Sequence, residues 1–239
     1  MRRISSLLLT VSLLLILFGG AFLGFEKIAL DPAVYDRLQA EISHYAYIGL
    51  EPAAQSRVNL VLADYLSGDR LDIDIEECLL GVRQQVFNAD EKAHMTDVYN
   101  LFALERRLRS FSLAAGAALL AIALLLSQKA TKRTALASMK AFLLTLLALA
   151  AALIILFQTS GFDRLFILFH KLFFTNELGL MDPRTDAMIR MFPSQFFMQI
   201  SIESGVWALI YGLAFTAAAW LIFLAAGSII HHPRRKQTP

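Results

Sequence analysis

The sequence is poor in cysteine and lacks the short motifs that mark several common kinds of catalytic site. Cys78 is the only cysteine in 239 residues, which excludes an internal disulfide framework and a thiolate zinc cluster. The signatures of zincins (H-E-x-x-H), of nucleophile-elbow hydrolases (G-x-S-x-G) and of phosphate-binding glycine loops are also missing. The net charge is only +2 and no basic stripe lies outside the membrane flanks, so we expect no nucleic-acid partner.

Charged residues are scarce as well, and long apolar segments take their place. Only 18% of the residues are charged and 57% are hydrophobic, a balance typical of a polytopic membrane protein. Each apolar segment is long enough to cross a bilayer as a helix at about 1.5 Å per residue. We therefore predict a mainly all-α fold with transmembrane helices at residues 1–25, 110–127, 141–160 and 205–230.

The first apolar segment has an alternative interpretation as a cleaved signal peptide. The apolar core of a signal peptide is shorter than this segment and ends in small residues of the A-x-A kind. Here the apolar run continues through Phe22, Leu23 and Phe25. We favour an uncleaved membrane anchor.

Basic residues without accompanying acids indicate how the chain is oriented. They occur at the N-terminus, in the predicted loop 128–140 and in the tail 231–239. The positive-inside rule places all three in the cytoplasm, so both termini should be cytoplasmic. The two intervening polar segments, residues 26–109 and 161–204, should then share the outer face.

Residues 26–109 have the composition of a small extramembrane domain. Asp31-Pro32 and Glu51-Pro52 mark two helix starts, and Ser67-Gly68 marks a turn. The alternation in residues 71–75 predicts a short strand, which would pair with residues 85–87 in a β-hairpin. No helix breaker follows Asn88, so residues 90–127 should form one continuous helix.

Residues 161–204 combine aromatic rings, charges and prolines. Phe162, Phe166, Phe169 and Phe173 recur at helical spacing and should form one face at the acyl-chain boundary, while Asp163 and His170 share another. Asp182 before Pro183 is typical of a helix N-cap, and Pro193 should end that short helix. We expect a re-entrant or interfacial helix, a turn and a second short helix.

Two histidines from these outer segments are the candidate acid/base groups. His94 has Glu91 three residues before it and Asp97 three residues after it, so a carboxylate could hold one ring nitrogen and leave the other available. The alternative for His94 is a solvated helix face, and for His170 it is an anchor at the membrane interface. A metal bound by both histidines and Asp97 is a further alternative, although the sequence fixes no ligand geometry.

Two stretches together resemble a known family. They are DEKAHMTDV at residues 90–98 and LFHKLFFTNELGLMDPRTDAMIRMFPSQFF at residues 168–197. In this order they resemble the bacterial lipoprotein intramolecular transacylase family, and the likeness covers all four apolar segments and both outer segments. The resemblance implies that His94 and His170 are catalytic, and we add Asp97 as their partner.

The resemblance also implies a reaction and a location. A diacylated bacterial lipoprotein in the plasma membrane would pass the sn-2 acyl chain of its diacylglyceryl-cysteine to the amine of the same cysteine, giving a lyso-form product without a cofactor. The predicted substrate contacts are Arg190, Asp182, Phe169 and Phe173, with membrane lipid around them. Two alternatives are a lipoprotein esterase and a non-enzymatic factor that binds lipoproteins or envelope partners. The oligomeric state stays open.

Overall fold

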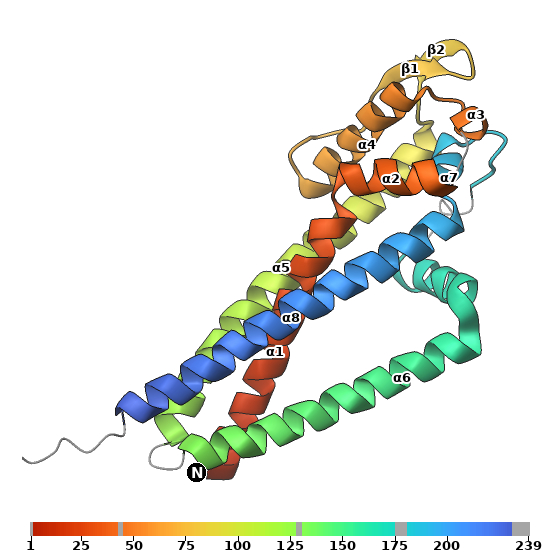
Figure 1. Cartoon of the computed structure of the whole chain (residues 1–239). Helices are drawn as coiled ribbons and strands as arrows, with labels where there is room; N and C mark the ends of the chain where they lie inside the picture. The colour runs from red at the N-terminus through yellow and green to blue at the C-terminus, as the bar shows by residue number, and fades with distance from the viewer. Residues whose placement is uncertain (1, 43–44, 128–130, 175–180, 231–239) are drawn as a thin grey trace, which may run out of the picture. The chain divides into compact units, whose positions relative to one another are not determined.

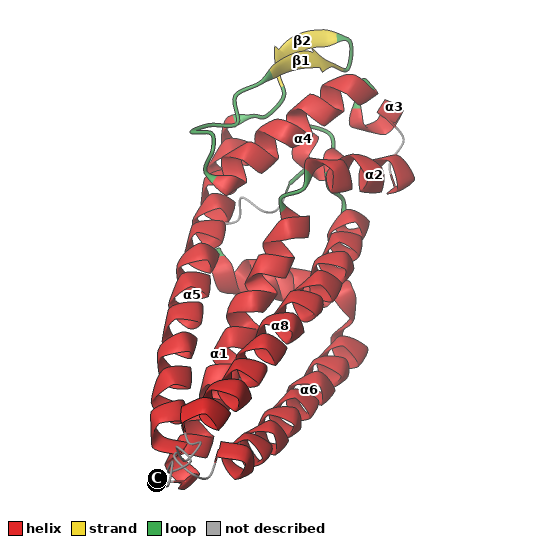
Figure 2. Ribbon diagram, turned by 60° about the vertical axis from the view of Figure 1, so that its left-hand side comes forward, coloured by secondary structure: helices red, strands yellow, loops and turns green. Residues whose placement is uncertain are grey.

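The computed structural model describes residues 2–42, 45–127, 131–174 and 181–230 (Figure 1). Within this part of the chain the secondary structure is mainly helical, and Figure 2 shows the two strands as a single hairpin. The predicted tail 231–239 and His44 lie outside the described residues. The helices are α1 (Arg2–Ala29), α2 (Pro32–Ile42), α3 (Tyr45–Ile48), α4 (Pro52–Ser67), α5 (Ala89–Ser127), α6 (Thr131–Phe173), α7 (Ala187–Met191) and α8 (Ser194–Ile230); the strands are β1 (Glu76–Leu79) and β2 (Val82–Gln85).

Four of the described helices, α1, α5, α6 and α8, are long and apolar enough to cross a membrane. This confirms the predicted polytopic, mainly α-helical fold. The prediction of one continuous helix through residues 90–127 is also confirmed by α5. Helix α6 begins at Thr131, inside the range 128–140 predicted as a loop, because lysine and arginine are good helix formers and their charge does not end a helix.

The described chain divides into two compact units. The first contains residues 1–24, 107–155 and 208–239. Small residues bring its helices close together: a Cβ on Gly116 would lie 2.7 Å from Cγ1 of Ile16, and Ser12 Oγ donates a hydrogen bond of 2.7 Å to the Gly116 carbonyl. Close packing is therefore the role of the small residue Gly116. The buried apolar core of this unit consists of Leu9, Leu13, Ile16, Ala123, Ala135, Phe142, Ala219 and Phe223.

The second unit contains residues 25–106 and 156–207 and has its own apolar core. Helices α2 and α4 begin at Pro32 and Pro52, which confirms both predicted starts. Gly68 ends α4 with a φ of 94°, a left-handed conformation that suits glycine at a helix C-terminus. Every residue of the candidate site described below belongs to this unit.

The hairpin is present, but its strands are not where the alternation places them. Leu79 pairs with Val82, and the turn between them has positive φ at both Leu80 and Gly81 (54° and 83°), as in a two-residue hairpin loop. The predicted strand at residues 71–75 is wrong. Asp72 accepts a hydrogen bond from the Asp74 N–H at 3.0 Å, a local turn that competes with strand pairing.

Helix α6 contains a kink at Gly161, whose φ of 71° and ψ of 166° are non-helical. The part after the kink carries the predicted aromatic face. The rings of Phe169 and Phe173 lie 4.9 Å apart, and Phe166 packs on the His170 ring at 4.3 Å. The aromatic face thus continues to the histidine.

The short helix that follows begins later than predicted. The Asp182 carbonyl accepts hydrogen bonds from the N–H groups of Thr185 and Asp186, so residues 182–186 form a turn instead of the first turn of a helix. Asp186 is the N-cap residue of α7, and the expectation that Asp182 caps this helix is wrong. The helix ends at Met191, just before Pro193, as predicted.

Candidate active site

The structure brings the two candidate histidines together. His94 lies near the start of α5 and His170 lies in the part of α6 beyond Gly161. Their ring centroids are 6.1 Å apart, and the ring planes are nearly parallel at 13°. Phe174 packs against both rings at 5.2 and 5.3 Å, so the pair has one apolar wall in common.

The two rings differ in their hydrogen bonds. His170 Nδ1 lies 2.8 Å from the carbonyl oxygen of Phe166. A carbonyl only accepts, so we assign the proton to Nδ1, which leaves the Nε2 lone pair available. His94 is only 8% exposed, and its buried Nδ1 has no hydrogen-bond partner among the described residues.

The surroundings of His94 favour its neutral form. His94 lies in the polar first turns of α5, well before the apolar segment 110–127. Burial lowers the pKa of His94 below its ordinary value, the neighbouring charge of His170 lowers it further, and Asp97 raises it in part. Since a neutral imidazole accepts a proton, this environment suits acid/base chemistry near neutral pH.

The Glu91 carboxylate binds two backbone N–H groups, and His94 Nδ1 has no hydrogen-bond partner among the described residues, Glu91 included. Oε2 accepts the Asn88 N–H at 2.7 Å, while the Glu91 N–H donates to Asn88 Oδ1 at 2.9 Å, which makes a reciprocal N-terminal cap. Oε1 accepts the Met188 N–H at 2.7 Å. Glu91 is only 1% exposed, and burial raises the pKa of its carboxyl group. The spacing Asn88-x-x-Glu91 is the sequence signal that could have identified this cap.

The other predicted contact residues lie in two places. Arg190 is buried and donates to the carbonyls of Ile48 and Pro183 at 3.4 and 2.9 Å. The guanidinium of Arg184 holds the pKa of the Asp182 carboxyl at about 2. Arg190 and Asp182 therefore belong to the 182–191 turn and helix. Phe169, by contrast, packs on the His170 ring at 5.6 Å.

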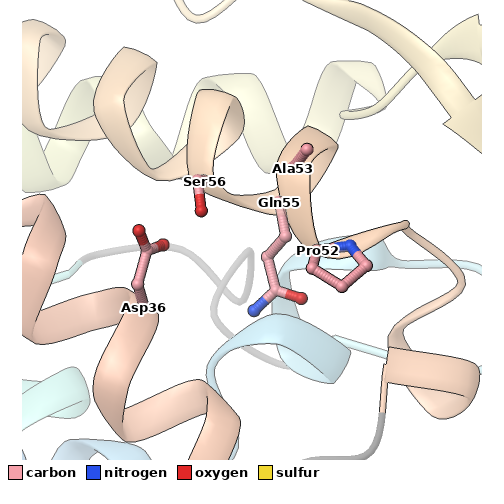
Figure 3. A pocket seen from close by; sticks show the side chains of 5 residues that line it. All are labelled: Asp36, Pro52, Ala53, Gln55 and Ser56. Carbon is pink, nitrogen blue, oxygen red and sulfur yellow. The ribbon is translucent and has the colours of Figure 1, made fainter.

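The described residues of this unit line two of the cavities in the molecule. The larger, of about 360 Å³, reaches from the hairpin to the start of α5 and to the 182–186 turn. The smaller, of about 180 Å³, lies between α2 and α4, where Figure 3 shows Asp36 and Gln55 on its walls. Gln39 connects this region to α7 by donating to the Met191 carbonyl at 3.1 Å. Among the described residues, no group of three or more histidine, cysteine or acidic side chains is placed to hold a metal.

Fold and site together define a multi-pass membrane protein whose second unit contains a histidine pair, in which His94 is buried and His170 is half-buried. Residues 7–197 match the family described as lipoprotein intramolecular transacylase Lit. The chain belongs to this family, and it is accordingly a membrane acyltransferase. No curated protein matches the sequence.

Solved structures share the fold. The membrane-integral lipoprotein intramolecular transacylase Lit from Bacillus cereus is 18% identical, with a TM-score of 0.65 over 96% of this chain and 97% of that one. A variant of the same protein with one histidine replaced by arginine is 20% identical, with a TM-score of 0.66 over 96% and 95% of the two chains. A third structure, with alanine at that histidine, has a TM-score of 0.62 at 19% identity over 96% of each chain.

Proposed function

We propose that the protein moves the sn-2 acyl chain of a diacylglyceryl-cysteine lipoprotein to the α-amine of the same cysteine, by histidine acid/base catalysis and without an acyl-enzyme. The observation that carries this proposal is the pairing of His94 and His170 at 6.1 Å beside Phe174. The family supplies the acyl-transfer reaction. A histidine is also the residue that was substituted in two of the related structures.

The reaction is the aminolysis of an ester. The amine nitrogen attacks the acyl carbon through a ring of the nitrogen, Cα, Cβ, sulfur, two glycerol carbons, the ester oxygen and the acyl carbon. The nitrogen–carbon bond forms and the bond from the acyl carbon to the glycerol oxygen breaks. An α-amine has a pKa of about 7.7–8.0, so a useful neutral fraction exists near neutral pH. The substrate thus supplies its own nucleophile.

The histidine pair needs to carry only one proton at a time. The attacking amine loses one proton, and the departing glycerol oxygen gains one. We assign His170 as the base, because its Nδ1 is fixed by the Phe166 carbonyl and its Nε2 lone pair is available. His94, with the charge of Asp97 near it, is the partner acid or orienting group: it is neutral at rest, so it accepts the proton from protonated His170 before that proton passes to the glycerol oxygen. General acid/base catalysis of this kind contributes about 10²- to 10⁴-fold.

The apolar surroundings match the acyl part of the substrate. Phe169 and Phe173 are exposed by 43% and 47% on the helix that carries His170, so they can contact acyl chains directly. We place this helix at the outer face of the bacterial plasma membrane, with both chain termini in the cytoplasm, because the acid-free basic clusters define the inner side. Arg190 and Asp182 would contact the substrate from the 182–191 segment.

Mass spectrometry of a diacylated lipoprotein peptide tests this function. The peptide is incubated in micelles with the wild-type protein, with His94→Ala, with His170→Ala and with Lys171→Ala, an exposed neighbour, as control. We expect an unchanged peptide mass with one acyl group moved from glycerol to nitrogen, lost in both histidine variants and retained in the control. Loss of one acyl mass would indicate an esterase. No transfer by folded wild-type protein would favour the non-enzymatic binding factor.

A further inference from the structure

The larger cavity is open to the outside and is lined by Glu91, three residues before His94 on α5. Its walls come from the hairpin, the first turn of α5 and the segment that contains the 182–186 turn, and they include both polar and apolar groups. A volume of about 360 Å³ lies at the small end of the range of about 300–1,000 Å³ typical of ligand sites. The lining residues that matter here are Gln84, Gln85, Glu91, Thr185 and Arg190.

Glu91 connects this cavity to the catalytic pair. It lines the cavity, and His94 lies three residues further along α5, about 4.5 Å along the helix axis and on the same face. The Met188 N–H donates to Glu91 and so joins α7 to α5 at this point. A group bound at the histidines is therefore within one helical turn of the cavity.

The chemistry of the walls suits a neutral ligand with both donors and acceptors. The guanidinium of buried Arg190 donates to the carbonyls of Ile48 and Pro183 and has further N–H groups that can donate to a ligand. Buried Glu91 supplies the opposite charge. The Val86 N–H donates a hydrogen bond of 3.0 Å to the Ile75 carbonyl across the hairpin. In an antiparallel pair, hydrogen-bonded and non-hydrogen-bonded residue pairs alternate. The N–H and C=O of the preceding residue, Gln85, therefore point away from β1 to the open edge of β2. These features match an extended peptide better than an ion of one sign.

We propose that this cavity binds the first two or three residues that follow the lipidated cysteine of the substrate, mainly through their main-chain groups. The inference rests on the proposed function. With the cysteine amine at the histidines and the acyl chains along the phenylalanine face, the peptide must leave from the same Cα in another direction. Successive residues of an extended chain advance about 3.3–3.6 Å each. The first two or three residues after the cysteine therefore reach the cavity.

A peptide-length series tests the proposal. The substrates are S-diacylglyceryl-cysteine amide, the corresponding tripeptide amide and the pentapeptide amide, each presented in micelles to the full-length protein. Two or three added hydrogen bonds should raise kcat/KM about tenfold from the cysteine amide to the tripeptide. The pentapeptide should give little further gain, because the cavity is then filled.

A cavity-filling variant locates the effect. Gln84→Trp places a bulky side chain on the cavity wall at a strand position that accommodates tryptophan. Arg83→Trp is the matched control, since the neighbouring strand residue points to the other face and is not part of the lining. The tripeptide-to-amide ratio of kcat/KM should fall from about tenfold to about one in Gln84→Trp and stay at about tenfold in Arg83→Trp.

Two outcomes would overturn the peptide site while leaving the transacylase function intact. One is equal kcat/KM for the cysteine amide and the longer peptides in the wild-type protein. The other is an unchanged length dependence in Gln84→Trp. Failure of the proposed function has a different signature, namely no acyl transfer to nitrogen on any of the three substrates.

Discussion

Replacing Glu91 tests how the start of α5 is held beside the catalytic pair. Its carboxylate receives the N–H groups of Asn88 and Met188, one on its own helix terminus and one on α7. Glu91→Ala removes both acceptors, whereas Glu91→Gln keeps one acceptor oxygen. We therefore expect stability to decrease in the order wild type, Gln, Ala.

The loss of stability depends on whether the N–H groups of Met188 and Asn88 can bind water once the Glu91 carboxylate is removed. Met188 is buried, so its N–H cannot turn to water and its loss of an acceptor costs about 1–3 kcal/mol. Asn88 is exposed, and there the loss is that of an N-terminal cap, about 0.5–2 kcal/mol. Relief from burying a carboxylate offsets part of this sum. A net loss of about 2–3 kcal/mol in Glu91→Ala corresponds to a Tm lower by roughly 4–12 °C.

Thermal unfolding in detergent micelles measures this difference. Asp90→Ala is the matched control, because it removes an exposed negative charge from the same helical turn and should cost only about 0.3–1 kcal/mol. Activity measured below the unfolding range should also fall more in Glu91→Gln than in the control, since the wall beside His94 loosens. A Glu91→Ala protein as stable as Asp90→Ala would refute this reasoning.

Two further predictions concern His94 and the kink. The NMR titration midpoint of His94 should lie below about 6.5. It should rise in His170→Ala and fall in Asp97→Asn, because His170 lowers and Asp97 raises the pKa of His94. Shifts of the opposite sign in these two variants would contradict this electrostatic account. His94 binds a proton more readily in the unfolded chain than in the folded protein. The free energy of unfolding should therefore decrease as the pH falls below about 6.5. Gly161→Ala should cost about 1–3 kcal/mol and reduce transfer activity, because its φ and ψ are essentially restricted to glycine even though no atom lies within 4 Å of a Cβ there. Gly205→Ala, at a helical site with equally open space, is the control: it should keep its activity and its Tm should not fall, because alanine is the better helix former by about 1 kcal/mol. An unaltered Gly161→Ala protein would show that the kink does not depend on glycine.

Sequence patterns gave wrong predictions of secondary structure where a short-range hydrogen bond or an unusual turn residue determines the local backbone conformation. The alternation of residues 71–75 predicts a strand, yet Asp72 folds back onto the Asp74 N–H. The actual hairpin turns at Leu80, a leucine with positive φ, and no common turn motif indicates such a residue. Asp182 likewise resembles a helix cap but is held by Arg184 in a turn.

The sequence by itself determined the features that depend on local composition and period. Four apolar segments, the proline-marked starts of α2 and α4 and the continuity of α5 follow from residues that are neighbours along the chain. Tertiary structure alone decided that His94 stacks on His170, that Phe174 is shared between them, and that Glu91 binds the Met188 N–H instead of a histidine. These contacts join distant parts of the chain, and their geometry depends on how whole helices pack, which no local pattern encodes.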